Sequence, residues 1–220
     1  YVVSHDLKAP LRAIHSYGDF LREDLEGRLE SEQQTYLDGL NRAIHQGEEL
    51  VDDLLEFSRV GKRLGPIEAI DLKVVLDDLV VALDLPANVE VYIPEGLPLL
   101  QGDETLIRQI FRNLLTNAVK FNRSEKKFVE VGWRADPDAY ELFVRDNGIG
   151  IDPQYSEKIF RVFQRLHTRT EYDGTGLGLA IVKKAAGKLH GTVRIESAPD
   201  QGSTFFVTLP KNPKEGSHER

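Results

Sequence analysis

A histidine and an aspartate stand side by side near the start of the chain, in the segment SHDLKAPLR. A neutral imidazole has an ordinary pKa of about 6.5. At pH 7, His5 could therefore act as a nucleophile, with Asp6 as its acid/base neighbour. Adjacent helical residues do not normally face each other, so Asp6 would have to swing across or act through water. An ordinary exposed histidine is the alternative, and this segment alone favours it.

Two asparagines lie four residues apart in the segment NLLTNAVKF, which has the apolar spacing of an amphipathic helix. Asn113 and Asn117 therefore share one helix face, and Lys120 follows three residues later. Neutral amide oxygens suit a hard cation that keeps several waters and is also held by phosphates, which describes Mg²⁺. Two incidental asparagines on a polar helix face are the alternative, and it is favoured when the segment is taken alone.

A carboxylate ends a predicted strand in the segment DNGIGI, and Gly148 and Gly150 follow it. Glycines let a ligand approach the backbone closely. Because the carboxylate of Asp146 only accepts hydrogen bonds, it would favour adenine, which has an exocyclic amine, over guanine, which has a carbonyl there. A simple Asp-Asn-Gly turn is the alternative.

A second glycine-rich segment, GTGLGLAIVKK, leads into a predicted helix through Gly174, Gly176 and Gly178. Backbone N–H groups at a helix N-terminus can bind phosphate. The spacing matches neither the P-loop nor the dinucleotide-binding fingerprint, and a glycine-rich loop by itself is weak evidence.

The segment between the two glycine-rich stretches, IFRVFQRLHTRTEYD, combines aromatic and basic residues. Phe160 and Phe163 are spaced to pack a short helix against the domain, and Arg161, Arg165 and Arg169 would then face phosphate. We interpret the segment as a mobile lid over a nucleotide. A solvated basic loop is the alternative.

Two long helices are predicted to carry the histidine. Gly27 can end the first helix, and Ser31 with Gln34 fits a capping box that starts the second. Other apolar residues lie off the main seam, so we expect two copies to pair as a homodimer in a four-helix bundle. The seam residues recur at alternating steps of three and four; they are Leu7, Leu11, Ile14, Gly18, Leu21, Leu25, Leu37, Leu40, Ile44, Gly47, Val51 and Leu54.

The rest of the chain mixes helices with antiparallel strands. A break rich in Gly, Pro and charge, RVGKRLGPIEAID, indicates an interdomain linker. Beyond it, helical segments alternate with a predicted strand, NVEVYIP, and two hairpins around ADPDA and APDQG. We predict an α+β fold: a helical hairpin over residues 1–60, a linker over 61–70, a two-layer α/β sandwich over 71–212 with helices on one face of the sheet, and a polar tail over 213–220.

The composition argues against several other functions. The chain has 220 residues and a net charge of −8, whereas sequence-independent nucleic-acid binding requires basic surface. It has no cysteine, which excludes disulfides and thiolate chemistry. No apolar run reaches membrane-spanning length, so we expect no membrane contact from this segment. Methionine is absent even at position 1, and we expect a piece of a longer protein whose sensor domain is missing from this chain.

Taken in order, these motifs resemble those of the sensor histidine kinases of two-component signalling. SHDLKAPLR is similar to that family's phosphoacceptor box, NLLTNAVKF to its asparagine box, DNGIGI and GTGLGL to its two glycine boxes, and FRVFQR to its phenylalanine box. The resemblance covers about residues 1–210. It implies an ATP-binding fold shared with gyrase, chaperone and mismatch-repair ATPases. The residues around SHDLKAPLRAI, FSRVG and FQRLHTR also resemble kinases attached to phytochrome-type photosensors.

The resemblance implies a role for each site residue. His5 would accept the γ-phosphoryl group of ATP, with Asp6 beside it, and would pass the group to an aspartate on the receiver domain of a response regulator. This segment would work in the cytoplasm. The residues implied in binding are Asn113 and Asn117 for Mg²⁺, and Lys120, Phe121, Asp146, Gly148, Gly150, Arg165, Gly174, Gly176, Leu177 and Gly178 for ATP, with Lys120 and Arg165 at phosphate and Phe121 and Asp146 at adenine.

Two other functions stay open on the sequence. A non-kinase ATPase of the same class would turn over ATP without forming phosphohistidine. A degenerate kinase acting as a dimeric scaffold would not bind Mg-ATP. Many relatives that also dephosphorylate their receiver carry Thr or Asn four residues after the histidine. Ala9 stands there and has no hydrogen-bonding side chain, which predicts weak receiver-phosphatase activity.

Overall fold

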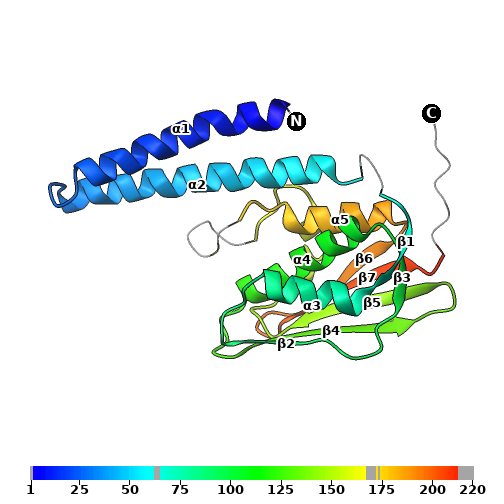
Figure 1. Cartoon of the computed structure of the whole chain (residues 1–220). Helices are drawn as coiled ribbons and strands as arrows, with labels where there is room; N and C mark the ends of the chain where they lie inside the picture. The colour runs from blue at the N-terminus through cyan, green and yellow to red at the C-terminus, as the bar shows by residue number, and fades with distance from the viewer. Residues whose placement is uncertain (1, 62–64, 167–171, 173, 213–220) are drawn as a thin grey trace.

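The computed structural model describes residues 2–61, 65–166, 172 and 174–212, and within the first helix it describes side chains from Ala9 onward. The chain folds into a long helical hairpin followed by an α/β domain (Figure 1). The hairpin consists of α1 (Val2–Asp24) and α2 (Ser31–Arg59). Its turn projects beyond the α/β domain, while the C-terminal half of α2 lies along that domain (Figure 1).

The start of α2 differs by one residue from the sequence prediction. Gly27 lies in the turn with a φ of 71°, as expected of a glycine that ends a helix. The N-cap, however, is Glu30, whose backbone N–H donates to Oε1 of Gln33 at 3.0 Å. The capping box is therefore Glu30 with Gln33, and the prediction of Ser31 with Gln34 was wrong because Glu30 can fill the same reciprocal role.

Only part of the hairpin's apolar seam is buried within one chain. Leu37 and Ile44 are buried, and Gly18 lets Ile44 and Asn41 of α2 approach α1 closely. Several large apolar side chains of the hairpin face solvent instead. They are Ile14, Tyr17, Phe20, Leu21, Tyr36, Leu40 and Leu54. An exposed apolar face of this extent is typical of a surface that another element covers.

The α/β domain is built on a five-stranded sheet with strand order β2-β4-β5-β7-β6. Its strands are β2 (Val89–Tyr92), β4 (Lys127–Ala135), β5 (Ala139–Asp146), β6 (Thr192–Ser197) and β7 (Ser203–Pro210). β2 runs parallel to β4, and every other pair is antiparallel. The predicted strand and both predicted hairpins are confirmed, because alternating burial fixed their register.

Three helices cover one face of this sheet: α3 (Leu72–Ala82), α4 (Glu104–Lys120) and α5 (Gly178–Lys188) (Figure 1). The core between helices and sheet includes Phe111 and Leu114 of α4 and Leu142 of β5, each at most 1% exposed. This arrangement confirms the predicted two-layer α/β domain with helices on one face.

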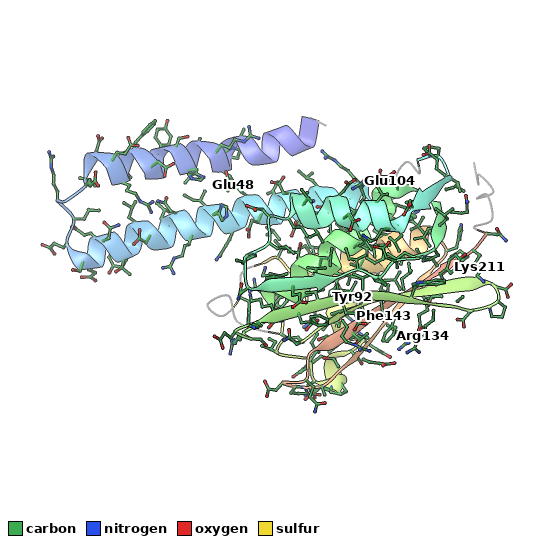
Figure 2. The ribbon with its side chains drawn as sticks, turned by 60° about the horizontal axis from the view of Figure 1, so that its bottom comes forward. Glu48, Tyr92, Glu104, Arg134, Phe143 and Lys211 are labelled. Atoms are coloured by element: carbon green, nitrogen blue, oxygen red, sulfur yellow. The ribbon has the colours of Figure 1, made fainter. Side chains whose placement is uncertain are left out.

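The opposite face of the sheet points away from the three helices. Figure 2 shows Tyr92, Phe143 and Arg134 on this side. Phe143 lies over Gly132, where a Cβ atom would come within 2.1 Å of the ring. The guanidinium of Arg194 covers the ring of Phe206 at 3.5 Å and pairs with Glu141 at 3.0 Å. Cation–π and ionic contacts between side chains of this face thus cover part of its apolar surface.

A small second sheet joins the hairpin to the α/β domain. β1 (Glu68–Asp71) pairs antiparallel with β3 (Leu99–Gly102). This pair was not predicted from the sequence, and β1 begins inside the range 61–70 that was assigned to the linker. Val60, the C-cap of α2, is 3% exposed and packs in the core of the α/β domain. Within the described residues, no helix combines the length and apolarity needed to cross a membrane.

Candidate functional site

One cavity, of about 270 Å³, opens between the α4 and α5 helices and the loops that precede α5. It gathers residues from every motif of the α/β domain and, in addition, two from α2. The lining residues are Asp53, Glu56, Arg112, Asn113, Thr116, Asn117, Lys120, Phe121, Asp146, Ile149, Gly150, Ile151, Ile159, Gln164, Arg165, Leu166, Tyr172, Gly174, Thr175, Gly176, Gly178, Leu179, Ser203 and Phe205.

The two asparagines of α4 face the start of α5. The amide nitrogen of Asn113 donates to the carbonyl of Gln109 at 2.8 Å, which turns its Oδ1 toward Gly178. A Cβ atom on Gly178 would lie 2.9 Å from that oxygen and 3.9 Å from the Asn117 amide. The amides therefore converge on one part of the cavity, and a neutral oxygen oriented in this way fits a hard cation that keeps most of its waters.

Lys120 lies one turn beyond the asparagines and reaches the glycine-rich segment. A Cβ atom on Gly174 would come within 2.6 Å of its Nζ, and Gly174 has a φ of 121°, which favours glycine. The ammonium is also 5.7 Å from the centre of the Phe121 ring. It thus places positive charge in the cavity next to the asparagine pair.

Asp146 lies at the other end of the cavity, at the C-terminus of β5. Its Oδ1 accepts hydrogen bonds from the backbone N–H groups of Gly148 at 2.8 Å and Ser203 at 3.3 Å. The side chain is 9% exposed. Burial raises its pKa to about 6, although the two backbone hydrogen bonds act in the opposite direction. Close packing requires glycine at 148, where a Cβ would come within 2.4 Å of the Phe121 carbonyl oxygen.

A network of two asparagines fixes Asp146 relative to α4. Oδ1 of Asn147 accepts from Nδ2 of Asn122 and from the backbone N–H of Phe128, both at 2.7 Å. Nδ2 of Asn147 donates to the carbonyl of Lys126 at 3.0 Å. Because Asn122 directly follows Phe121, this network sets the distance between the two ends of the cavity. Neither residue was predicted to act in the site, because the hydrogen bond between them spans 25 positions of the chain.

The glycine-rich segment before α5 is shaped by left-handed backbone. Gly176 has a φ of 75°, and a Cβ there would clash with the Gln164 carbonyl oxygen at 2.8 Å. Gly174, Gly176 and Gly178 all line the cavity. Leu177, in contrast, is fully buried in the core beneath the segment. The cavity lining includes neither Leu177 nor Gly148, so any nucleotide contact they make remains a prediction.

Arg165 joins the two ends of the segment predicted to form a lid. Its guanidinium donates to the carbonyl of Tyr172 at 2.6 Å and to the carbonyl of Gly174. The Arg165 side chain also lines the cavity. Its contact with a terminal phosphate remains a prediction. Arg169 lies outside the described residues.

The two phenylalanines of that segment behave differently. Phe160 ends the short helix η2 (Lys158–Phe160), is 8% exposed, and meets Phe205 edge to face at 6.5 Å. Phe163 is 56% exposed and has a φ of 61°, an unusual conformation for a bulky residue. The prediction that both rings pack against the domain is therefore confirmed for Phe160 and wrong for Phe163, because the helix ends before it.

Two carboxylates of α2 also line the cavity. Asp53 accepts a hydrogen bond from Oγ1 of Thr175, and Glu56 accepts one from Nε2 of Gln109 at 2.7 Å. Nothing in the sequence indicated this, because it depends on how the hairpin docks against the α/β domain. Figure 1 and Figure 2 both place α2 between α1 and that domain.

The predicted phosphoacceptor pair belongs to the first turns of α1. The side chains of His5 and Asp6 lie outside the described residues, so their roles remain predictions. Pro10 follows within the same helix. It removes one backbone hydrogen bond, which weakens the helix next to the histidine.

Comparison with known proteins identifies both parts of the chain. The family model of the "Histidine kinase-, DNA gyrase B-, and HSP90-like ATPase" matches residues 102–213, and that of the "His Kinase A (phospho-acceptor) domain" matches residues 1–63. Cyanobacterial phytochrome B of Nostoc sp. is 39% identical over 214 residues, which cover 95% of this chain and 28% of that protein.

More distant relatives agree. The methanogenesis regulatory histidine kinase FilI of Methanothrix harundinacea is 34% identical over 215 residues, covering 96% of this chain and 24% of that protein. The crystal structure of full-length ShkA in complex with AMPPNP has a TM-score of 0.70 at 27% identity, covering 98% of this chain and 46% of ShkA. The chain spans about a quarter of the length of the two curated relatives. Since the two family models account for both the hairpin and the ATP-binding domain, the chain belongs to the sensor histidine kinases of two-component signalling.

Proposed function

We propose that the chain autophosphorylates on His5 at the expense of ATP and passes the phosphoryl group to an aspartate of a response-regulator receiver domain. The observation that carries this proposal is the cavity itself. At one end it brings together the amides of Asn113 and Asn117 with the ammonium of Lys120, and at the other the carboxylate of Asp146. Phosphoryl transfer depends mainly on such positioning and on charge neutralisation.

Each end of the cavity suits one part of the nucleotide. Asp146 accepts the exocyclic amine of adenine, and Phe121 lies beside the base. Lys120 and the backbone N–H groups at the start of α5 hold the phosphates. Asn113 and Asn117 would hold Mg²⁺, which neutralises charge on the phosphates when bound.

In the transfer itself, a ring nitrogen of His5 forms a bond to the γ-phosphorus as the bond from that phosphorus to the bridging oxygen breaks. ADP leaves, and Asp6 takes up the proton from the imidazole. Because α2 lies between α1 and the ATP-binding domain within one chain and lines the cavity with Asp53 and Glu56, the reaction requires that domain to move, or to serve the histidine of a second copy. The exposed apolar face of the hairpin supports a homodimer.

The full-length protein would combine this segment with a sensor domain. Relatives named as phytochromes or phytochrome-like match 95–98% of this chain with 28% of their own length, so we propose a cytoplasmic signalling kinase of the phytochrome-associated type.

Radiolabelled ATP tests the proposal. The wild-type chain should acquire acid-labile, alkali-stable label in the presence of Mg²⁺, and His5→Gln should abolish it while ADP binding survives. His190→Gln is the matched control, because His190 lies on the loop after α5 and should not affect labelling. Label that persists in His5→Gln would contradict the assignment, and ATP turnover without any label would favour a non-kinase ATPase.

A further inference from the structure

The docked hairpin closes one end of the nucleotide cavity with negative charge. Asp53 and Glu56 are three residues apart on α2 and so share a face. Both line the cavity, and each is held by a residue of the ATP-binding domain: Asp53 by Thr175, and Glu56 by Gln109. Neither carboxylate belongs to the motifs that mark the nucleotide site.

The order of residues along α4 shows which end these carboxylates close. Gln109, Asn113 and Asn117 follow at intervals of four and therefore share one face. Phe121 comes next, where its carbonyl accepts from the backbone N–H of Ile149, close to Asp146. Glu56 bonds to Gln109, at the opposite end of this row. A nucleotide with its adenine at Asp146 extends along this face toward α2.

Thr175 connects α2 directly to the phosphate-binding segment. Its Oγ1 donates to Asp53 and accepts from the backbone N–H of Leu177 at 3.2 Å. Gly174 and Gly176 flank it with left-handed backbone angles. The conformation of the segment in front of α5 is therefore tied to the position of α2.

Other contacts hold α2 in this position. Nζ of Lys184 on α5 donates to the carbonyl of Phe57 at 2.6 Å and lies 4.3 Å from the centre of its ring. Val60 is buried in the core of the ATP-binding domain. The carboxylates of Asp53 and Glu56 are thus fixed by docking along the last two turns of the helix.

We propose that Asp53 and Glu56 are specificity-determining residues that make the docked hairpin selective for the nucleoside diphosphate. ADP fits beneath α2, whereas the terminal phosphate of ATP brings further negative charge next to the two carboxylates and is repelled. The proposal rests on the proposed function only in placing adenine at Asp146. By linkage, the same repulsion acts in both directions: ATP favours release of α2, whereas ADP leaves the docked state undisturbed.

This selectivity would suit the proposed reaction. Because α2 lies between α1 and the ATP-binding domain, the ATP-loaded domain has to leave this position before it can reach the histidine of its own chain. After transfer, the ADP-loaded domain returns to it. The carboxylates would therefore couple domain movement to the state of the nucleotide, without any contact between them and His5.

Calorimetric titration of the 220-residue chain with ADP and with AMPPNP, both with Mg²⁺, tests the selectivity. Asp53→Asn and Glu56→Gln keep an acceptor oxygen but remove the charge. Together they should raise the affinity for AMPPNP by about fivefold to tenfold and change that for ADP by less than about twofold. Glu26→Gln, on the exposed hairpin turn, is the control for loss of charge. An unchanged affinity ratio would overturn the proposal, and so would weaker AMPPNP binding, which would instead indicate that the carboxylates hold the metal.

The position of α2 can be measured separately because the chain has no cysteine. Dyes on His45→Cys of α2 and Val81→Cys of α3, in labelled chains diluted into unlabelled ones, would report the distance by energy transfer. AMPPNP should lower the transfer relative to ADP, and the double variant should abolish that difference. Equal transfer with both bound nucleotides would overturn the proposal. If the two nucleotides give this difference but the chain acquires no radiolabel on His5 from ATP, only the phosphoacceptor role is contradicted.

Discussion

At the scale of single residues, the ionisation of Asp146 connects the buried site to pH. Its pKa lies at about 6 because the side chain is buried, whereas its ordinary value is 3.8. Only the ionised carboxylate accepts the adenine amine without a competing O–H donor. At pH 7 the group is mainly ionised, and near pH 5 it is mainly protonated.

We predict that the affinity for ADP falls by up to about tenfold for each pH unit below about 6, because binding then has to remove a proton from Asp146. Asp146→Asn should bind weakly at every pH and lose this dependence. Calorimetric titrations between pH 5 and pH 8 would measure it. An affinity that stays constant down to pH 5 would show that the carboxylate does not contact the base.

Folding stability provides an independent check of the pKa of Asp146. Protonation of this carboxyl weakens nucleotide binding but stabilises the folded state, so the two quantities change with pH in opposite directions. Between pH 4 and pH 6 the folded state binds more protons than the unfolded state, so the free energy of unfolding falls as pH rises. The rise of the Asp146 pKa from 3.8 to about 6 corresponds to ~3 kcal/mol of stability lost across that window. Urea denaturation of the wild type and of Asp146→Asn should therefore differ in slope below about pH 6 and run parallel above it.

Residues of the site differed in how far sequence could identify them. Asp146 and Asn117 stand in motifs whose spacing indicates chemistry, and the structure places both at the cavity. Asn122 and Asn147 act through hydrogen bonds across 25 positions of the chain, which no local pattern reports. The side chain of Phe163 was predicted to pack, but its burial depended on where a short helix ends.

At the scale of elements, the periodicity of apolar residues predicted the helices and strands that are long and half-buried. The 17-residue helix α4 and the hairpins β4–β5 and β6–β7 were all identified, because each alternates between core and solvent over many residues. The strands β1 and β3 were missed, because β1 begins inside the segment assigned to the linker and its pairing with β3 joins distant parts of the chain. The parallel pairing of β2 with β4 also depends on long-range contacts alone.

The N-cap of α4 stabilises two elements at once. Oδ1 of Asp103 accepts from the backbone N–H of Thr105 at 2.8 Å, and Oδ2 accepts from that of Gly65 at 2.6 Å. The buried carboxylate therefore starts the helix and holds the linker at Gly65. Asp103→Ala should lower the free energy of unfolding by about 2 kcal/mol, measured by urea denaturation. Asp71→Ala, which removes the exposed cap of α3, should cost less, and equal losses would contradict a role in holding the linker.

At the scale of the whole molecule, the way in which the hairpin docks against the ATP-binding domain could not be predicted from the sequence. The predicted division into two units rested on composition, and the linker was the only connection that the sequence indicated. The structure adds a docked interface in which Val60 enters the core and Lys184 holds the carbonyl of Phe57. Such contacts join segments that lie far apart in the sequence, as Phe57 and Lys184 do, and no local pattern indicates them.

The exposed apolar face of the hairpin leads to the prediction of a homodimer. Ile14 is 45% and Leu40 is 43% exposed, and both belong to the seam that a second hairpin would cover. Ile14→Glu and Leu40→Glu would each bury a charge in that bundle, and should weaken the dimer by about a hundredfold or more. Light scattering at micromolar concentration should give twice the chain mass for the wild type and a monomer for both variants. Val81→Glu is the control, since Val81 is 80% exposed on α3, outside the hairpin. A wild-type chain that stays monomeric, or hairpin variants that stay dimeric, would contradict the bundle.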